Sequence, residues 1–442
     1  MKIFKKINIF FGGVKIADKK LSTQDIPVVD MPLPEKVIIP LIQHVGEPAV
    51  PVIEKGMRVK TGQLIAESKG FISANVHASI NGTVKEIVRA YHPKIGACGS
   101  VIIESDDEDE LVPPVILTEN EVGKLSIDEL LNKIKNAGVV GLGGAAFPTH
   151  VKLKIARDKK VDVLIVNAVE CEPFITSDYR LMLENCREIV LGLKAAVKIT
   201  GAEKVFIAIK KDKDKAIKLF EKELKAEDNI KIAKVNKKYP QGAEKQLIKT
   251  VLNREVPSGK LPLDIGVTVS NVTTLYAVYE AIYKGKALYE QIVTVSGNGI
   301  VNPANLRVRV GTPLRKIVEF CGLKDADKIK VIIGGPMMGT AQSNLEAPIV
   351  KGSNCVLVFI DEEIKVFEDN PCIKCARCAE VCPAKILPMR IAQLARRDKI
   401  KELDSLNIMD CIECGCCAYV CPAGIPLVEL IKLGKNKKRR KK

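Results

Sequence analysis

The chain has 442 residues, of which 47% are hydrophobic and 4% aromatic, and its formal net charge is +16. This length exceeds one ordinary hydrophobic core and predicts several domains, while the hydrophobic content excludes a disordered chain. A basic excess can favour nucleic acid, but tryptophan is absent and no nucleic-acid-binding motif occurs, so we expect no nucleic-acid partner.

The cysteine distribution indicates a reducing compartment. Nine of the fourteen cysteines fall in two C-terminal runs and the other five are scattered, which is typical of metal-bound thiolates and not of a disulfide scaffold. The sequence lacks a run of about twenty apolar residues suited to spanning a membrane, and its N-terminal apolar run is too short and too charged for a secretory signal. We therefore expect a cytoplasmic location or peripheral attachment to the cytoplasmic face of the cell membrane.

Residues 36–105 are predicted to be β structure, because short segments rich in valine and isoleucine alternate there with turns containing glycine and asparagine. GMRVKTGQLI at 56–65, followed by ASINGTV, resembles a biotinyl/lipoyl-type barrel-sandwich module. Carrier proteins of that type acylate a lysine at the hairpin tip, but the turn at 78–81 has none, so we expect a structural or docking module. The acidic run ESDDEDE at 104–110 predicts a solvated linker, and residues 1–115 form the first expected unit.

The second expected unit, residues 116–287, alternates strands with helices. Strand-like segments are expected at 161–168, 204–209, 229–235 and 266–271, with amphipathic helical stretches between them, notably 177–200. This pattern predicts a mostly parallel sheet covered on both faces. Ligands on such sheets bind at the carboxyl ends of the strands.

A glycine-rich loop, GLGGAAFP, starts at Gly141. A dinucleotide fingerprint is disfavoured, because a helix at 125–138 precedes the loop where the fingerprint needs a strand. The glycines offer closely approachable backbone N–H groups, which suit a phosphate or a flat ring; the alternative is a tight structural turn.

Three polar loops, NAVECEP, YPQGAE and SNVTT, follow strands of the same sheet. Their carboxylates and amides could bind ribityl or ribose hydroxyls, and Lys152 could meet a phosphate. For any single residue a helix cap is the alternative interpretation, but together they predict a cofactor pocket. Cys171 lies between two glutamates, which raise a thiol pKa, so we do not expect it to act as a nucleophile.

Residues 288–350 return to β character around a short helix, and residues 351–442 become helical around the cysteines. The spacing C-x-x-C-x-x-C-x-x-x-C-P occurs at 372–383 and again at 411–422. It is the bacterial ferredoxin pattern for cubane clusters, whereas zinc knots usually show isolated C-x-x-C pairs. We therefore predict two [4Fe–4S] clusters.

In two-cluster ferredoxins the fourth cysteine of each run serves the other cluster. The predicted ligands are Cys372, Cys375, Cys378 and Cys421 for one cluster, and Cys411, Cys414, Cys417 and Cys382 for the other. Cys416 is out of register and is predicted to be a packing or hydrogen-bonding thiol. The basic tail at 435–442 is either a solvated, frayed terminus or a segment attracted to an anionic membrane surface.

A family resemblance connects these motifs. GLGGAAFPTHVKL resembles the GRGGAGFPTGLKW loop of the flavin-binding subunit of respiratory complex I, NAVECEP resembles its NADESEP segment, and SNVTTL its NNVETL. The order of units along essentially the whole chain resembles the RnfC component of the Rnf complex. The resemblance implies a multidomain α/β chain: a β barrel-sandwich hybrid, a Rossmann-like flavin/NAD domain, a small soluble-ligand-binding β-grasp and a helical two-cluster ferredoxin domain.

The resemblance also implies noncovalent FMN, NAD(H) and integral and peripheral Rnf subunits as partners. The implied flavin contacts are Gly141, Gly143, Gly144, Lys152, Asn167, Gly242, Glu244, Asn271 and Thr274. Glu170 and Glu172 are implied to lie near the nicotinamide nucleotide. The sequence departs from the complex I pattern at Leu142, Val169 and Ala243.

The expected function is electron transfer between NAD(H), FMN and two clusters, in a membrane complex that couples ferredoxin:NAD oxidoreduction to ion translocation. No protein acid or base is required for hydride transfer, so no catalytic residue is assigned. The alternatives are a soluble flavin/iron–sulfur cobalamin reductase of a diol-utilising microcompartment and a structural adaptor whose clusters only stabilise its fold.

Overall fold

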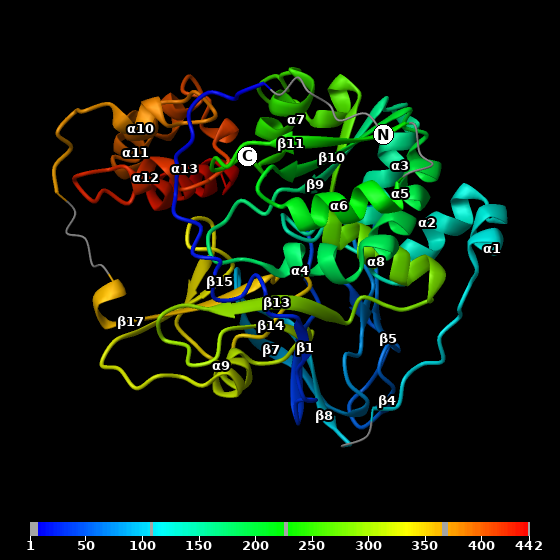
Figure 1. Cartoon of the computed structure of the whole chain (residues 1–442). Helices are drawn as coiled ribbons and strands as arrows, with labels where there is room; N and C mark the ends of the chain where they lie inside the picture. Colours follow the sequence, from blue (N-terminus) through cyan, green and yellow to red (C-terminus); the bar gives the residue numbers. More distant parts are fainter. Residues whose placement is uncertain (1–7, 107–108, 225–228, 365–369, 441–442) are drawn as a thin grey trace.

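The computed structural model describes residues 8–106, 109–224, 229–364 and 370–440 (Figure 1). It is a mixed α/β structure with four β-sheets and a separate helical region at the carboxyl end. None of the helices within these ranges is both long and apolar enough to cross a membrane.

The first region is a sandwich of two small antiparallel sheets with one hydrophobic core between them. One sheet has the order β2 (Lys36–Pro40), β8 (Gly96–Ser105), β7 (Gly82–His92), β4 (Arg58–Val59), and the other β3 (Val50–Pro51), β5 (Leu64–Glu67), β6 (Val76–His77). The turn at 78–81 is buried, and Ser79 Oγ donates to the Val310 carbonyl at 2.5 Å. A buried turn cannot swing, which agrees with a docking or structural role.

The described residues of the acidic run at 104–110 are exposed or half-buried, and some of them also have fixed partners. Glu104 and Ser105 belong to β8, and Asp109 accepts from Thr61 Oγ1 at 2.7 Å and from Arg309 Nη2 at 2.5 Å. Residues 107 and 108 lie outside the described ranges. Asp109 thus fastens the run to the sandwich and to the sheet that follows.

The second region is a four-stranded parallel sheet of order β11 (Ile230–Val235), β10 (Lys204–Lys210), β9 (Val163–Ala168), β12 (Val267–Asn271). Alternate residues of β9 face opposite sides: Leu164 and Val166 join one apolar core, and Val163 and Ile165 join another. Both faces are therefore covered, as a parallel sheet requires.

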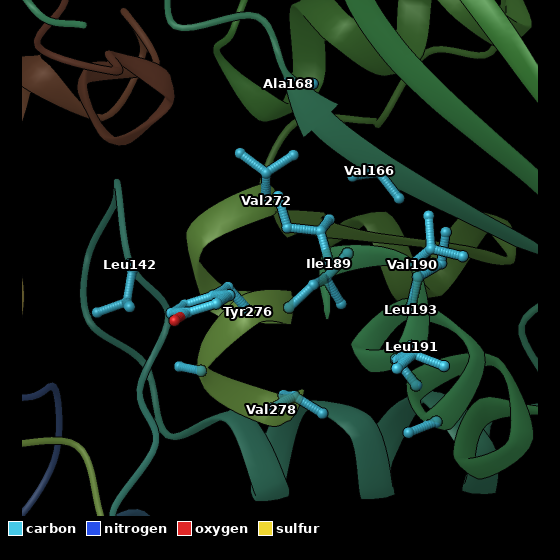
Figure 2. Packing of buried hydrophobic residues seen from close by; sticks show 14 of the residues in the cluster. Leu142, Val166, Ala168, Ile189, Val190, Leu191, Leu193, Val272, Tyr276 and Val278 are labelled. Carbon is cyan, nitrogen blue, oxygen red and sulfur yellow. The ribbon is translucent and has the colours of Figure 1, made fainter. Parts of the chain in front are cut away.

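The helices of this region are α1 (Glu119–Lys124), α2 (Ile127–Asn136), α3 (Thr149–Asp158), α4 (Ser177–Glu184), α5 (Cys186–Thr200), α6 (Asp214–Glu223), α7 (Glu244–Leu252) and α8 (Val272–Tyr283). The helical stretch predicted at 177–200 is divided into α4 and α5, because Asn185 leaves the helical conformation (φ −134°, ψ 40°). Figure 2 shows α5 and α8 packed together beside β9, with Leu142 of the glycine-rich loop near Tyr276.

Gly192 permits the close contact between α5 and α8. A Cβ at this position would lie 1.9 Å from the Leu275 carbonyl oxygen and 3.1 Å from Tyr279 N. Both are backbone atoms of α8, so a side chain can be accommodated only if the two helices separate.

We therefore expect Gly192→Ala to lower the stability of the α/β region by roughly 3 kcal/mol, through overpacking. The measurement is the urea midpoint of the full chain, followed by far-UV circular dichroism. Gly123→Ala in α1 is the matched control, since a Cβ there meets nothing within 4 Å, and alanine is preferred to glycine in helices by about 0.5–1 kcal/mol. Equal midpoints for the two variants would contradict this account of the contact.

A six-stranded mixed sheet joins parts of the chain that are far apart in sequence. Its order is β1 (Val28–Asp30), β14 (Ala304–Arg309), β13 (Glu290–Ser296), β17 (Cys355–Ile360), β15 (Ile329–Ile333), β16 (Thr340–Gln342), and it packs on α9 (Leu314–Cys321). Its strands therefore extend on both sides of the unit expected at 288–350. Strand β17 pairs in parallel with β13 and antiparallel with β15, so it closes the middle of the sheet.

The carboxyl-terminal region contains short helices around the cysteines: α10 (Arg377–Glu380), α11 (Pro388–Arg396), α12 (Cys416–Tyr419) and α13 (Leu427–Arg440). The prediction of a frayed tail is wrong as far as residue 440, because α13 continues to that point. Lys437 pairs with Asp398 at 2.8 Å, and Lys438 pairs with Asp404. These pairs occupy cations that an anionic membrane surface would otherwise attract; residues 441 and 442 lie outside the described ranges.

The amino-terminal segment 8–20, called the strap here, does not belong to the sandwich sheets. Gly13 N donates to the Val381 carbonyl at 2.8 Å, and Val14 N donates to the Tyr239 carbonyl at 2.8 Å. Further along, Lys20 is 2% exposed and its Nζ lies 3.1 Å from Glu170 Oε2. The strap thus lies across the α/β region and the carboxyl-terminal region and links them; in Figure 1 its blue trace passes between the two.

One buried lysine lies where three regions meet. Lys351 is 1% exposed, and its Nζ donates to the carbonyls of Asn75, in the sandwich, and Gly138, after α2, each at 2.7 Å. Its own backbone N–H donates to Gln43 Oε1 at 3.0 Å. Burial lowers the pKa of Lys351 from 10.5 to about 7.

Candidate functional site

The structure gathers the cysteines into the two predicted groups, each around its own cavity. One cavity is lined by Cys372, Cys375, Cys378 and Cys421, which we call the outer set. The other is lined by Cys382, Cys411, Cys414 and Cys417, which we call the inner set. In each set three thiols come from one run and the fourth from the other, as the exchange of fourth ligands predicts.

The two runs have the same backbone geometry around their first thiol. Lys374 N donates to Cys372 Sγ, and Glu413 N donates to Cys411 Sγ, each at 3.4 Å. Both donors have positive φ values, 58° and 56°. Ala376 and Gly415, two residues further on in each run, are also left-handed, at 62° and 80°. These turns bring the backbone of each run around its cavity.

This donor set fits iron–sulfur clusters. Thiolates are the protein ligands of cubane clusters, and N–H donors to their sulfurs are among the factors that set cluster potentials. Among the described residues, no three or more His, Cys, Asp or Glu side chains are close enough together to hold a metal ion directly. The four thiols of each set instead surround a space between them, which suits a bulky cluster.

Cys416 is fully buried (0% exposed) and lines the inner cavity with the four predicted ligands. The corresponding position in the first run is Arg377, which is exposed. Cys416 also packs in a small apolar cluster with Val14 and Tyr239. These contacts suit the packing role predicted for Cys416. Its position outside the ligand spacing did not indicate that it would line the cavity.

The inner set lies against the strand-end loops of the α/β region. Tyr239 Oη donates to the Cys414 carbonyl at 2.8 Å and lies 3.3 Å from Glu172 Oε1. Gln246 Nε2 donates to the Pro383 carbonyl at 3.1 Å, next to Cys382. The outer set has no such neighbour among these contacts, and its Cys375 is exposed.

Most of the predicted flavin residues meet at one edge of the parallel sheet. Leu142 N, in the glycine-rich loop, donates to Thr274 Oγ1 at 2.8 Å. Gly143 has φ +76°, and a Cβ there would lie 2.9 Å from Asn271 Nδ2. The loop is therefore held against the start of α8 by two of the predicted residues.

The other predicted flavin residues pair with one another at the neighbouring strand ends. Asn167 Nδ2, on β9, donates to the Gly242 carbonyl at 2.8 Å. Lys152 Nζ, on α3, pairs with Glu244 Oε1 at 3.1 Å. Strands β9 and β12 are adjacent and parallel, so their carboxyl ends bring these groups to the same edge.

The residues around this edge fit a flavin nucleotide. A Cβ at Gly144 would meet nothing within 4 Å, so the loop backbone faces open space there. Thr149 Oγ1 and Ser177 Oγ, at the starts of α3 and α4, are buried without a hydrogen-bond partner in the described structure. Thr149 directly follows the glycine-rich loop, and a free hydroxyl beside such a backbone is a group that a polar, flat ligand can use.

The two glutamates predicted near the nicotinamide nucleotide have different surroundings. Glu170 is bound by the chain itself: it pairs with Lys20, and its Oε1 accepts from Asp178 N at 2.7 Å. Glu172 accepts from Met337 N at 3.1 Å, and burial raises its pKa to about 7. Glu172 is thus a carboxylate that can gain or lose a proton near neutral pH.

Two residues near the site were not assigned roles from the sequence. Asp178 accepts from Asn271 Nδ2 at 2.7 Å and from Thr273 Oγ1 at 2.6 Å, and burial raises its pKa to about 6. Tyr239 links Glu172 to the inner set. A sequence signal existed for both, since Asp178 begins a helix after NAVECEP and Tyr239 opens YPQGAE, but neither reveals its distant partner.

Cys171 also lies at this edge, and burial raises its pKa to about 11. Its thiol therefore stays protonated near neutral pH, which agrees with its exclusion as a nucleophile. A Cβ at Gly242 would lie 3.2 Å from the Cys171 sulfur, so the thiol fills space beneath the YPQGAE loop.

Comparison with protein families accounts for most of the chain. Residues 8–108 match the RnfC barrel sandwich hybrid domain, and residues 134–280 match the Nuo51 FMN-binding domain. Residues 292–341 match the SLBB domain, and residues 371–425 match the 4Fe-4S dicluster domain. The chain therefore carries an FMN-binding domain and a dicluster domain of known families.

A fold likeness also exists among solved structures. The NAD+-reducing [NiFe]-hydrogenase in its H2-reduced state superposes with a TM-score of 0.51 at 20% identity, over 71% of this chain and 62% of that chain. At this identity the likeness concerns the fold alone.

Curated relatives match nearly the whole chain. The C component of the proton-translocating ferredoxin:NAD(+) oxidoreductase complex of Clostridium ljungdahlii is 43% identical, over 91% of this chain and 88% of the relative. The Na(+)-translocating counterpart of Acetobacterium woodii is 40% identical, over 92% and 91%. The C component of the ion-translocating oxidoreductase complex of Pseudomonas aeruginosa is 38% identical, over 91% of this chain but 52% of that longer protein. The chain therefore belongs to the RnfC family, whose members are components of ion-translocating ferredoxin:NAD(+) oxidoreductase complexes.

Proposed function

We propose that this chain is the NAD(H)-facing subunit of an ion-translocating ferredoxin:NAD oxidoreductase complex. The observation that carries the proposal is the contact between its two predicted cofactor regions: Tyr239 joins Glu172, at the strand-end edge, to the Cys414 carbonyl of the inner set. Cofactor sites whose surrounding residues are in contact hold their redox centres close together, which suits electron exchange. The alternative cobalamin reductase is not favoured by the curated relatives.

When bound, FMN exchanges a hydride with NAD(H) and single electrons with iron–sulfur clusters. The glycine-rich loop would support the flavin, with Lys152 and Glu244 beside it and Asn167 and Asn271 at the strand ends. Glu172 can hold a proton near the nicotinamide nucleotide, because its pKa is about 7. Glu170 acts indirectly, by fixing the start of α4 and the strap.

The two thiol sets define an order along the electron path. The inner set contacts the α/β region and so lies next to the flavin, whereas the outer set bears the exposed Cys375. The outer set is therefore the side from which electrons pass to or from integral and peripheral partner subunits. A position on the cytoplasmic face of the membrane gives this arrangement access to NAD(H).

We propose a four-domain architecture for the chain. The first 115 residues comprise the strap, β1 and the sandwich with its acidic run, and 116–287 form a Rossmann-like flavin/NAD domain. The β-grasp covers 288–350 with added strands on both sides, and a helical ferredoxin domain covers 351–442. The four-stranded parallel sheet with helices on both faces supports the Rossmann-like assignment.

The test uses the full chain, purified anaerobically with its flavin and clusters. NADH should reduce the clusters, as monitored by electron paramagnetic resonance, and the chain should co-purify with integral subunits from its host membranes.

Thr274→Val should reduce flavin content and slow cluster reduction, because Leu142 N loses a buried acceptor, at a cost of about 1–3 kcal/mol. Thr274→Ser keeps the hydroxyl and serves as the control. A wholly soluble chain without flavin would contradict the proposal.

A further inference from the structure

The two cysteine runs carry opposite charges at one equivalent position. Lys374 and Glu413 each donate a backbone N–H to the first thiol of their run and share the same left-handed turn. Lys374 is exposed, whereas Glu413 is partly buried next to the inner set. The same backbone therefore places a cation beside the outer set and an anion beside the inner set.

The anion at Glu413 is matched by a buried cation from another helix. Lys435, on α13, is 5% exposed, and its Nζ lies 2.7 Å from Glu413 Oε1. The same Nζ donates to the carbonyl of Cys411, an inner-set thiol residue, at 2.6 Å. A charge in this position is poorly screened by solvent and salt, unlike the exposed lysines around it.

We propose that the balance of charge between Lys435 and Glu413 controls the reduction potential of the cluster held by the inner set. This inference rests on the proposed function, because it requires a cluster at that site. Reduction adds one negative charge to a cluster, so a nearby cation stabilises the reduced form and a nearby anion destabilises it. Net charge is one of the factors that fix cluster potentials. Both residues act through charge and position, without ligating iron.

The pair allows a test in which two single substitutions should shift the cluster potential in opposite directions. Lys435→Gln leaves Glu413 unbalanced and should lower the potential of one cluster, whereas Glu413→Gln leaves Lys435 unbalanced and should raise it. Each single change should alter the reduced-to-oxidised ratio at fixed ambient potential by roughly tenfold, about 59 mV for one electron. The double variant should return close to the wild-type potential.

The measurement is a potentiometric titration of the full chain with both clusters bound, followed by electron paramagnetic resonance. Lys435→Arg, which keeps the charge, should leave both potentials unchanged. Lys437→Gln is the matched control, since this lysine lies on the same helix but pairs with the exposed Asp398. If Lys435→Gln loses its cluster, Glu413→Gln and the double variant still test the direction in which the potential shifts.

The outcomes separate this inference from the proposed function. Opposite shifts confined to one cluster support the charge pair. Unchanged potentials, or shifts in the same direction for both single variants, overturn the inference while leaving the function intact. Wild-type protein without any cluster signal overturns both.

Discussion

Replacing Cys382 with serine should remove about half of the iron from the anaerobically purified chain, from about eight atoms to about four. Cys382 belongs to the first run but lines the inner cavity with Cys411, Cys414 and Cys417. A serine hydroxyl is a poor substitute for a thiolate as an iron ligand, so the inner cluster should be lost or damaged. The measurement is iron and acid-labile sulfide per chain.

The matched control is Cys416→Ser, another buried cysteine lining the same cavity. If Cys416 is a packing thiol, its variant should keep about eight irons. The reverse result, with iron lost from Cys416→Ser and kept in Cys382→Ser, would replace Cys382 by Cys416 in the ligand set. The two variants thus decide whether Cys382 or Cys416 is the ligand of the inner cluster.

Stability should rise with pH in the wild-type chain relative to Lys351→Met. Burial lowers the folded-state pKa of Lys351 to about 7, against 10.5 for an ordinary lysine. Between these values the unfolded chain binds a proton that the folded chain does not, so raising the pH favours the folded state. The gain should reach several kcal/mol between pH 7 and pH 10, at 1.36 kcal/mol per pKa unit.

The measurement is the difference in urea-unfolding free energy between wild type and Lys351→Met at several pH values. Lys330→Met, which changes an exposed lysine of β15, is the control and should show a constant difference. His44 and His77 lie near Lys351, and burial lowers the pKa of each, to about 4 and about 3. Both are neutral in the tested window and present in each variant. If the difference in unfolding free energy between wild type and Lys351→Met does not change with pH, the Lys351 amine keeps its proton when buried.

The parts of the fold that were predictable depend on local patterns. The four strands of the parallel sheet lie within one or two residues of the predicted segments, because strands covered on both faces are nearly continuous runs of branched apolar residues. The cysteine sets followed from spacing, since ligand spacing is constrained by the size of the cluster. The glycine-rich loop was found because its composition is unusual.

The parts that were not predictable depend on distant contacts. Nothing near Lys20 in the sequence indicates that it pairs with Glu170, and nothing near Lys351 indicates its carbonyl partners in two other regions. The tail shows the same limit: its lysines resemble a disordered basic run, yet the acidic partners of Lys437 and Lys438 are Asp398 and Asp404, far earlier in the sequence. Composition describes a segment, whereas these outcomes depend on what packs against it.

The strap has a consequence for the order of folding. Its residues leave the ribosome before those of the regions that it links, since synthesis proceeds from the amino terminus. Its backbone partners, however, are Tyr239 and Val381, which are made much later. Because such long-range contacts form only after loop closure has been achieved, a segment that is synthesised early is fixed late. Completion of the inner cluster site and docking of the strap are therefore both late events.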